Sequence, residues 1–100
     1  MPDAVILEFD GLGRDQYEAV NGILGVDPVA GTGDWPPGLM LHSAGPTDDG
    51  WVVFEVWDSQ DAQEAFMRDR LGAALAAGGV DGPPSRVQWL PDALHHAPEG

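Results

Sequence analysis

The stretch LMLHSAGPTDDGWVVFEVW, residues 39–57, decides the fold of this chain. Two runs rich in branched and aromatic residues, 39–44 and 51–57, flank the turn-forming segment 45–50, which predicts a β-hairpin with a long turn. Pairing Gly45 with Gly50 divides the side chains between two sides. The first side carries Met40, His42, Ala44, Trp51, Val53, Glu55 and Trp57. The second side carries Leu39, Leu41, Val52, Phe54 and Val56.

Neither side of this hairpin is polar enough to face water. We therefore expect helices of the same chain to cover one side and a second copy of the chain to cover the other. A homodimer also suits the length of 100 residues, because a domain of this size buries only about 65% of its unfolded surface.

The segments around the hairpin complete a βαββαβ order. Residues 4–10 predict a strand and residues 14–24 an amphipathic helix, whereas the Gly- and Pro-rich residues 25–38 predict a long loop. Ser59 is expected to cap a helix that runs to Ala77, and residues 85–90 predict the last strand. This order is α+β and ferredoxin-like, with a four-stranded antiparallel sheet that carries both helices on one face and pairs into a dimeric α/β barrel. Residues 1–90 form the single domain and residues 91–100 a C-terminal extension.

The composition excludes several kinds of partner. The chain has 17 Asp and Glu against four Arg and no Lys, a formal net charge of −13, which disfavours nucleic acid and anionic membranes. It has no Cys, which excludes a disulfide, a thiolate zinc site and a Cys nucleophile. Because there is neither a long apolar run nor a basic signal-peptide region, we expect a cytoplasmic protein.

The first side of the hairpin carries the side chains that could take part in catalysis or ligand binding. His42 and Glu55 are the candidate catalytic pair, with His42 as acid, base or substrate orienter and Glu55 as its partner. Glu8 has the same parity as Ile6 on the first strand and is expected on this side too, and Arg86 on the last strand completes the lining. The apolar wall of this ligand pocket is expected to be Met40, Trp51 and Trp57, which suits a small planar ligand.

Each candidate also has a structural explanation. A single His on an apolar strand is more often a hydrogen-bonded core or interface residue than a catalyst. Trp51 and Trp57 at such spacing more often fill the core or a dimer interface than line a ligand site. Glu55 needs a partner if it is buried, and Arg86 could be that partner. Asp92, His95 and His96 are possible metal ligands, but adjacent His side chains in a Pro-flanked tail are expected to diverge, so no metal site is expected.

Three motifs resemble the antibiotic-biosynthesis-monooxygenase-like superfamily of dimeric α/β barrels. They are Pro37-Gly38-Leu39-Met40-Leu41-His42, then Asp49-Gly50-Trp51-Val52-Val53, and then Val56-Trp57-Asp58-Ser59 with Phe66 in the following helix. The resemblance spans roughly residues 4–90. It implies a homodimer with a ligand pocket between sheet and helices in each subunit.

Characterised members of that superfamily include cofactor-independent monooxygenases that oxidise aromatic polyketides to quinones, and haem-degrading enzymes with a helix-borne axial His. The helix expected over residues 59–77 has no His, which argues against haem. The resemblance therefore implies a small-molecule enzyme that oxidises a planar aromatic substrate without a cofactor. The alternative is a non-catalytic small-ligand-binding or structural homodimeric module, and a cavity of a few hundred Å³ would favour the enzyme.

Overall fold

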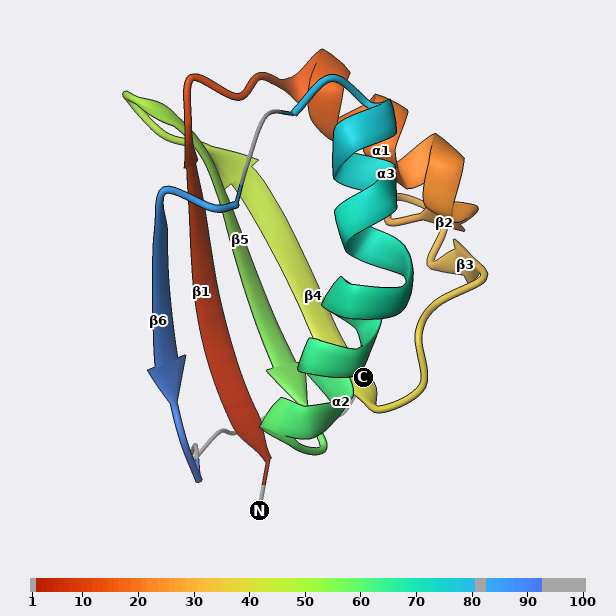
Figure 1. The fold of residues 1–100 in the computed structure, drawn as a ribbon, viewed down its shortest axis with the longest axis vertical. Helices are drawn as coiled ribbons and strands as arrows, with labels where there is room; N and C mark the ends of the chain where they lie inside the picture. The colour runs from red at the N-terminus through yellow and green to blue at the C-terminus, as the bar shows by residue number, and fades with distance from the viewer. Residues whose placement is uncertain (1, 81–82, 93–100) are drawn as a thin grey trace.

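The computed structural model describes residues 2–80 and 83–92 of the chain. The elements in chain order are β1 (Asp3–Asp10), α1 (Arg14–Leu24), β2 (Val26–Asp27), β3 (Thr32–Gly33), β4 (Leu39–Pro46), β5 (Gly50–Trp57), α2 (Gln60–Phe66), the π-helix η1 (Met67–Leu71), α3 (Gly72–Ala77) and β6 (Arg86–Leu90). An antiparallel sheet of order β4-β5-β1-β6 carries the helices on one face (Figure 1). The predicted ferredoxin-like fold is confirmed. Among the described residues, no helix is both long and apolar enough to cross a membrane.

Helix α1 has the bounds that the sequence predicts. The side chain of Gln16 accepts a hydrogen bond from the backbone N–H of Gly13 at its start. Gly25 ends the helix with a positive φ of 79° and donates its N–H to the carbonyl of Asn21. The buried side of α1, with Val20 and Asn21, faces the sheet.

The segment 25–38, which we call the flap, is more ordered than the predicted loop. It contains the two-residue strands β2 and β3, paired through Val26 and Gly33. Arg70 of η1 donates hydrogen bonds to the backbone carbonyls of Leu24 and Asp34, so the flap is tied to the second helical segment.

The second helical segment begins as predicted but is not a single α-helix. The Ser59 hydroxyl caps it by accepting a hydrogen bond from the N–H of Ala62 at 3.2 Å. A π-helical stretch, η1, then separates α2 from α3. Such stretches insert an extra residue into a turn and are frequent at functional sites. Two residues of η1 have contacts elsewhere in the fold. Leu71 lines the interior, and Arg70 binds the flap.

The hairpin register differs from the prediction in two ways. Gly45 pairs with Val52 rather than Gly50, a slip of two residues that leaves the two sides unchanged. A β-bulge between Leu39 and Leu41 then moves Leu39 to the side of Trp57.

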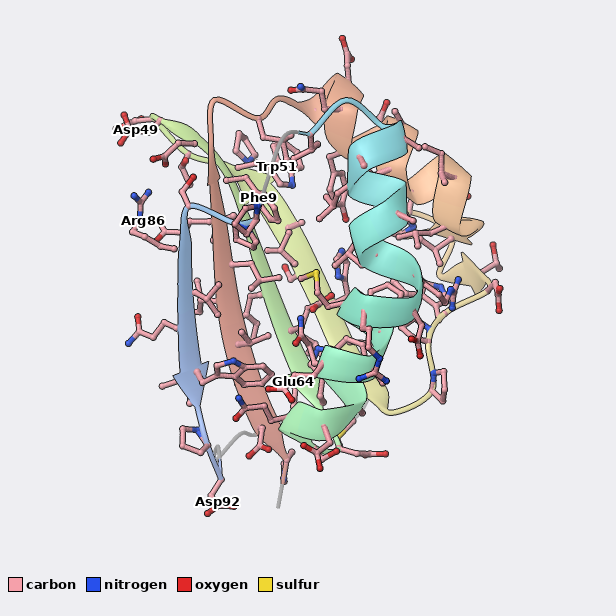
Figure 2. All side chains as sticks on the ribbon, in the orientation of Figure 1. Phe9, Asp49, Trp51, Glu64, Arg86 and Asp92 are labelled. Atoms are coloured by element: carbon pink, nitrogen blue, oxygen red, sulfur yellow. The ribbon has the colours of Figure 1, made fainter. Side chains whose placement is uncertain are left out.

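The two faces of the sheet have different surroundings. Phe9 and Trp51 point towards the helices, whereas Arg86 points away from them (Figure 2). The core between sheet and helices includes Val5, Leu7, Phe9, Trp51, Val53, Trp57, Val20, Phe66 and Leu75. The other face leaves Leu41, Phe54 and Leu90 exposed.

Candidate functional site

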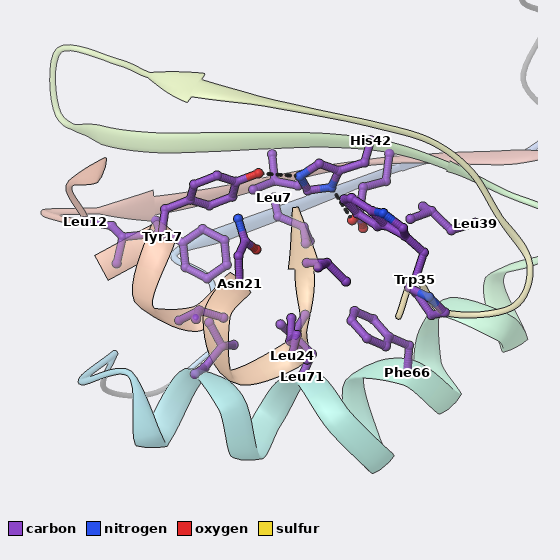
Figure 3. Close-up of a pocket in the computed structure, with 17 residues that line it drawn as sticks. Leu7, Leu12, Tyr17, Asn21, Leu24, Trp35, Leu39, His42, Phe66 and Leu71 are labelled. Carbon is purple, nitrogen blue, oxygen red and sulfur yellow. Dashed lines mark hydrogen bonds and ion pairs between the residues drawn. The ribbon is translucent and has the colours of Figure 1, made fainter. Parts of the chain in front are cut away.

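Three side chains from three elements form a continuous hydrogen-bonded chain. His42 of β4 and Glu55 of β5 are directly paired residues of the hairpin, and Nδ1 of His42 lies 2.9 Å from Oε2 of Glu55. Tyr17 of α1 approaches from the helix layer, with its Oη 2.6 Å from Nε2 of His42 (Figure 3). The side chains of His42 and Glu55 are only 13% and 7% exposed. Both imidazole nitrogens are therefore engaged inside the protein.

Among the described residues, His42 is the ionisable side chain that contacts the buried Glu55 carboxylate. Its second oxygen accepts a hydrogen bond from Nε1 of the fully buried Trp57, at 3.1 Å. The sequence has no Lys, and each Arg pairs with other carboxylates. These pairs are Arg14 with Glu18, Arg68 with Asp69, Arg70 with Asp34, and Arg86 with Glu8 and Asp10. An imidazolium at His42 would therefore be stabilised directly by Glu55.

The protonation of the three side chains determines which atom donates in each hydrogen bond. An ionised carboxylate only accepts, so Nδ1 of His42 carries the hydrogen of the His42–Glu55 bond. When the imidazole is neutral, Nε2 is the acceptor and the Tyr17 hydroxyl donates to it. This direction leaves lone pairs of the Tyr17 oxygen available to an external O–H group. It is the arrangement of a base oriented by a carboxylate.

The Tyr17 phenol holds its proton more firmly than an exposed tyrosine. Burial raises the pKa of Tyr17 above its ordinary value of 10.0, the negative charge of Glu55 raises it further, and the neighbouring Asn21 amide partly opposes both effects. The phenol is consequently protonated throughout the neutral range. It can donate to His42 and pass a proton on only when it receives one.

Two spaces meet at this hydrogen-bonded chain. An inner cavity of about 60 Å³ lies between sheet and helices, lined mainly by apolar side chains. An open cleft of about 690 Å³ lies between α1, the flap and the end of β4. Tyr17, Asn21, Val26 and His42 line both. The large space is thus an open cleft rather than the enclosed cavity of a few hundred Å³ considered from the sequence.

Aromatic side chains lie beside the hydrogen-bonded Tyr17–His42–Glu55 chain. The Trp35 ring, carried by the flap, lies 5.4 Å from the His42 ring, and the Trp51 ring lies 4.9 Å from that of Tyr17. Nε1 of Trp51 is buried without an acceptor in the described part of the chain, although Trp51 lines the open cleft. A buried indole N–H usually has a partner, so this donor is an exception, and it is shielded from the cleft that the rest of Trp51 lines.

The predicted site residues divide into two groups. His42 and Glu55 lie together at the inner cavity, and Trp51 lines the open cleft. Trp57 lies beneath Glu55 against Phe66, with ring centroids 5.7 Å apart, and lines neither space. Trp57 is therefore placed to hold the carboxylate rather than to touch a ligand.

The predicted placement of Glu8, Arg86 and Met40 at the pocket is wrong. Glu8 pairs across the sheet with Val52, which puts it on the face away from the helices, where Arg86 binds it at 2.9 Å. Met40 lies at the β-bulge and is 53% exposed, so that Leu39 takes its place in the lining.

The sequence reading did not identify Tyr17, Asn21 and Trp35 as site residues. On helical spacing Tyr17 belongs to the apolar side of the helix 14–24, and Trp35 lies in the Gly- and Pro-rich segment 25–38, which predicts a loop. The available signal was an aromatic hydroxyl on the buried side of a helix. His95 and His96 lie outside the described residues, and within 2–80 and 83–92 no cluster of possible metal ligands occurs.

Comparisons with solved structures agree with this architecture. A candidate antibiotic biosynthesis monooxygenase from Chloroflexus aurantiacus J-10-fl superposes with a TM-score of 0.64 at 17% identity, covering 97% of this chain and 98% of that one. Rv0793 from Mycobacterium tuberculosis superposes with a TM-score of 0.61 at 21% identity, covering 97% of this chain and 100% of that one. A monooxygenase from the gene ActVA-Orf6 of Streptomyces coelicolor, in complex with the ligand nanaomycin D, superposes with a TM-score of 0.55 at 23% identity. The match covers 98% of this chain and 92% of that one.

A dimeric ferredoxin-like protein of unknown function from Thermobifida fusca YX is also similar, with a TM-score of 0.51 at 19% identity over 89% of this chain and 86% of that one. No family model and no curated protein matches the sequence. Likeness at this level of identity is a likeness of fold, and it agrees with the resemblance found in the sequence. The chain therefore has the ferredoxin-like fold of the antibiotic-biosynthesis-monooxygenase-like proteins.

Proposed function

We propose that the protein is a small-molecule oxygenase that oxidises a planar phenolic substrate in the open cleft, with the Tyr17–His42–Glu55 chain as its proton acceptor. The observation that carries this proposal is the linked geometry of 2.6 Å from Tyr17 to His42 and 2.9 Å from His42 to Glu55, at a wall shared by two spaces. A buried base with an orienting carboxylate is the arrangement that general-base catalysis requires.

The proposed proton transfer uses the direction of the hydrogen bonds. A substrate hydroxyl in the cleft donates to the Tyr17 oxygen, the Tyr17 proton moves to Nε2 of His42, and the resulting imidazolium is stabilised by Glu55. The phenolate that forms is electron-rich and can reduce dioxygen. The ring then loses two hydrogen atoms and gains one oxygen atom, and the second oxygen atom leaves as water. The substrate thus supplies all the electrons.

Aromatic groups would orient a planar substrate. Trp51 lines the cleft and packs against the Tyr17 ring, which suits an aromatic substrate. Trp35 on the flap offers a ring beside His42. The similarity in fold to a monooxygenase in complex with the ligand nanaomycin D supports the proposal of an oxygenase.

The proposal includes a homodimer formed through the face of the sheet away from the helices. That face carries the exposed side chains Leu41, Phe54 and Leu90. Apolar side chains gathered on one face are typical of an interface. The dimeric ferredoxin-like protein of similar fold supports this arrangement.

The test is dissolved-oxygen uptake by the wild-type protein with a panel of fused-ring phenols, together with the absorbance of any quinone formed. We expect at least one phenol to give one quinone for each dioxygen consumed, and the same phenol to bind in calorimetry. Binding of phenols without oxygen uptake would contradict the enzyme and support the non-catalytic ligand-binding module. A panel that neither binds nor reacts would contradict both.

A further inference from the structure

We infer that the inner cavity is a binding site for dioxygen, separate from the open cleft that takes the organic substrate. This inference rests on the proposed oxygenase function. It assigns the two reactants to the two spaces that meet at Tyr17 and His42.

The size of the inner cavity selects a very small ligand. A cavity of about 60 Å³ exceeds the roughly 10–15 Å³ that one water needs, but it is well below the ~150 Å³ of an engineered apolar cavity that binds benzene. A diatomic gas fits, whereas an aromatic ring does not. The organic substrate therefore has to occupy the cleft.

The chemistry of the cavity wall favours an apolar ligand over water. Most of the wall is aliphatic or aromatic, with Leu7 and Val53 from the sheet and Leu71 and Leu75 from the helices. Each residue that lines it is buried or half-buried. Wholly apolar cavities stay dry and bind apolar gases, and the aliphatic part of this wall provides the same surroundings.

The polar groups at one end of the cavity are already engaged. Both nitrogens of His42 and both oxygens of Glu55 have hydrogen-bond partners inside the protein, and the Tyr17 hydroxyl donates to His42. An enclosed water needs two to four polar partners. The Tyr17 oxygen and the Asn21 amide remain, but both lie on the wall shared with the cleft, so a water bound to them would leave the apolar part of the cavity free.

The position of the cavity connects it to the proposed chemistry. Tyr17, Asn21, Val26 and His42 line both spaces, so a gas molecule that leaves the cavity at this wall enters the cleft beside the proton-accepting atoms. The cavity would hold dioxygen next to the place where the phenolate forms.

The direct probe is dioxygen itself, because it is paramagnetic and broadens the NMR signals of nearby methyl groups. We expect oxygen pressure to enhance the relaxation of the Val53, Leu71 and Leu75 methyls several-fold over that of Val29, which is 92% exposed. Xenon pressure should shift the same methyls in a saturable way. Equal relaxation at Val29 and Val53, or no xenon shift, would overturn the inference while leaving the oxygenase proposal untouched.

A cavity-filling variant links binding to function. Leu71→Phe should abolish the selective relaxation at Val53 and raise the KM for dioxygen, with the KM for the phenol unchanged. Ile23→Phe, on the exposed side of α1, is the matched control. Leu24→Phe fills the cavity from α1 if Leu71→Phe fails to fold. Loss of gas binding with an unchanged KM for dioxygen would overturn the inference. If the wild-type protein has no oxygen uptake with any phenol, the assigned role falls with the proposed function, whatever the gas binding shows.

Discussion

The Tyr17 hydroxyl lies 2.6 Å from Nε2 of His42, although the two residues are 25 positions apart and belong to different layers of the fold. The contact exists because α1 packs across the sheet above β4, and because His42 and Glu55 are paired on the side facing the helices. A helix residue and a hairpin thus build one hydrogen-bonded chain.

The ionisation of Tyr17 should respond to Glu55. The Glu55 charge raises the Tyr17 pKa, so Glu55→Gln should lower it, while burial keeps the wild-type pKa above 10. The chain has a single Tyr, so the ultraviolet absorbance of tyrosinate reports this residue alone. Asp61→Asn on the exposed side of α2 is the control, and an unchanged Tyr17 pKa in Glu55→Gln would show that Glu55 is not electrostatically coupled to Tyr17.

Trp57 should stabilise the folded protein through its N–H as well as its ring. Trp57→Phe keeps an aromatic ring but leaves the buried Oε1 of Glu55 without its donor, which should lower the free energy of unfolding by about 1–3 kcal/mol. Urea unfolding followed by circular dichroism measures this. Trp89→Phe on the edge strand β6 is the matched control. An equal or smaller loss in Trp57→Phe than in Trp89→Phe would contradict the assigned role.

Arg70 should hold the flap closed over the site. Its guanidinium donates to the carbonyls of Leu24 and Asp34, so Arg70→Gln should increase amide hydrogen exchange across residues 25–38. Arg68→Gln is the matched control, because Arg68 is exposed and pairs with the adjacent Asp69. Mass spectrometry of exchanged peptides makes the comparison. Equal exchange in the two variants would mean that the flap is held by other contacts.

How far the sequence predicts this molecule depends on how local each feature is. The bounds of α1 follow from helical spacing and the Gly25 stop, and the Ser59 cap follows from the residues beside it. The π-helical η1 has no comparable local signal. The bulge beside Leu39, which excludes Met40 from the cavity, depends on how two strands align.

In the candidate site, too, contacts between residues near in sequence could be predicted and contacts between distant elements could not. The pairing of His42 with Glu55 could be predicted because two neighbouring strands of one hairpin carry them. The side on which Glu8 lies depends on the register between β1 and β5, which are far apart in sequence, so parity within β1 alone could not decide it. Tyr17 could not be assigned to His42 because their contact depends on the packing of a helix against the sheet.

The homodimer can be tested through the open face of the sheet. We expect light scattering at micromolar concentration to give twice the mass of 10.6 kDa per chain. Phe54→Glu should then yield monomers, because a buried charge without a partner is strongly unfavourable at an interface. Ile23→Glu on α1 should leave the mass unchanged. A wild-type monomer would contradict the proposed dimer.

The most direct test of the central claim is the initial rate of dioxygen uptake by Tyr17→Phe with a phenol that the wild-type protein oxidises. The substitution removes only the hydroxyl that links substrate to His42. We expect kcat to fall by about 10²-fold or more, with the circular dichroism spectrum retained. A rate equal to that of the wild-type protein would contradict the role of the Tyr17–His42–Glu55 chain as the proton acceptor.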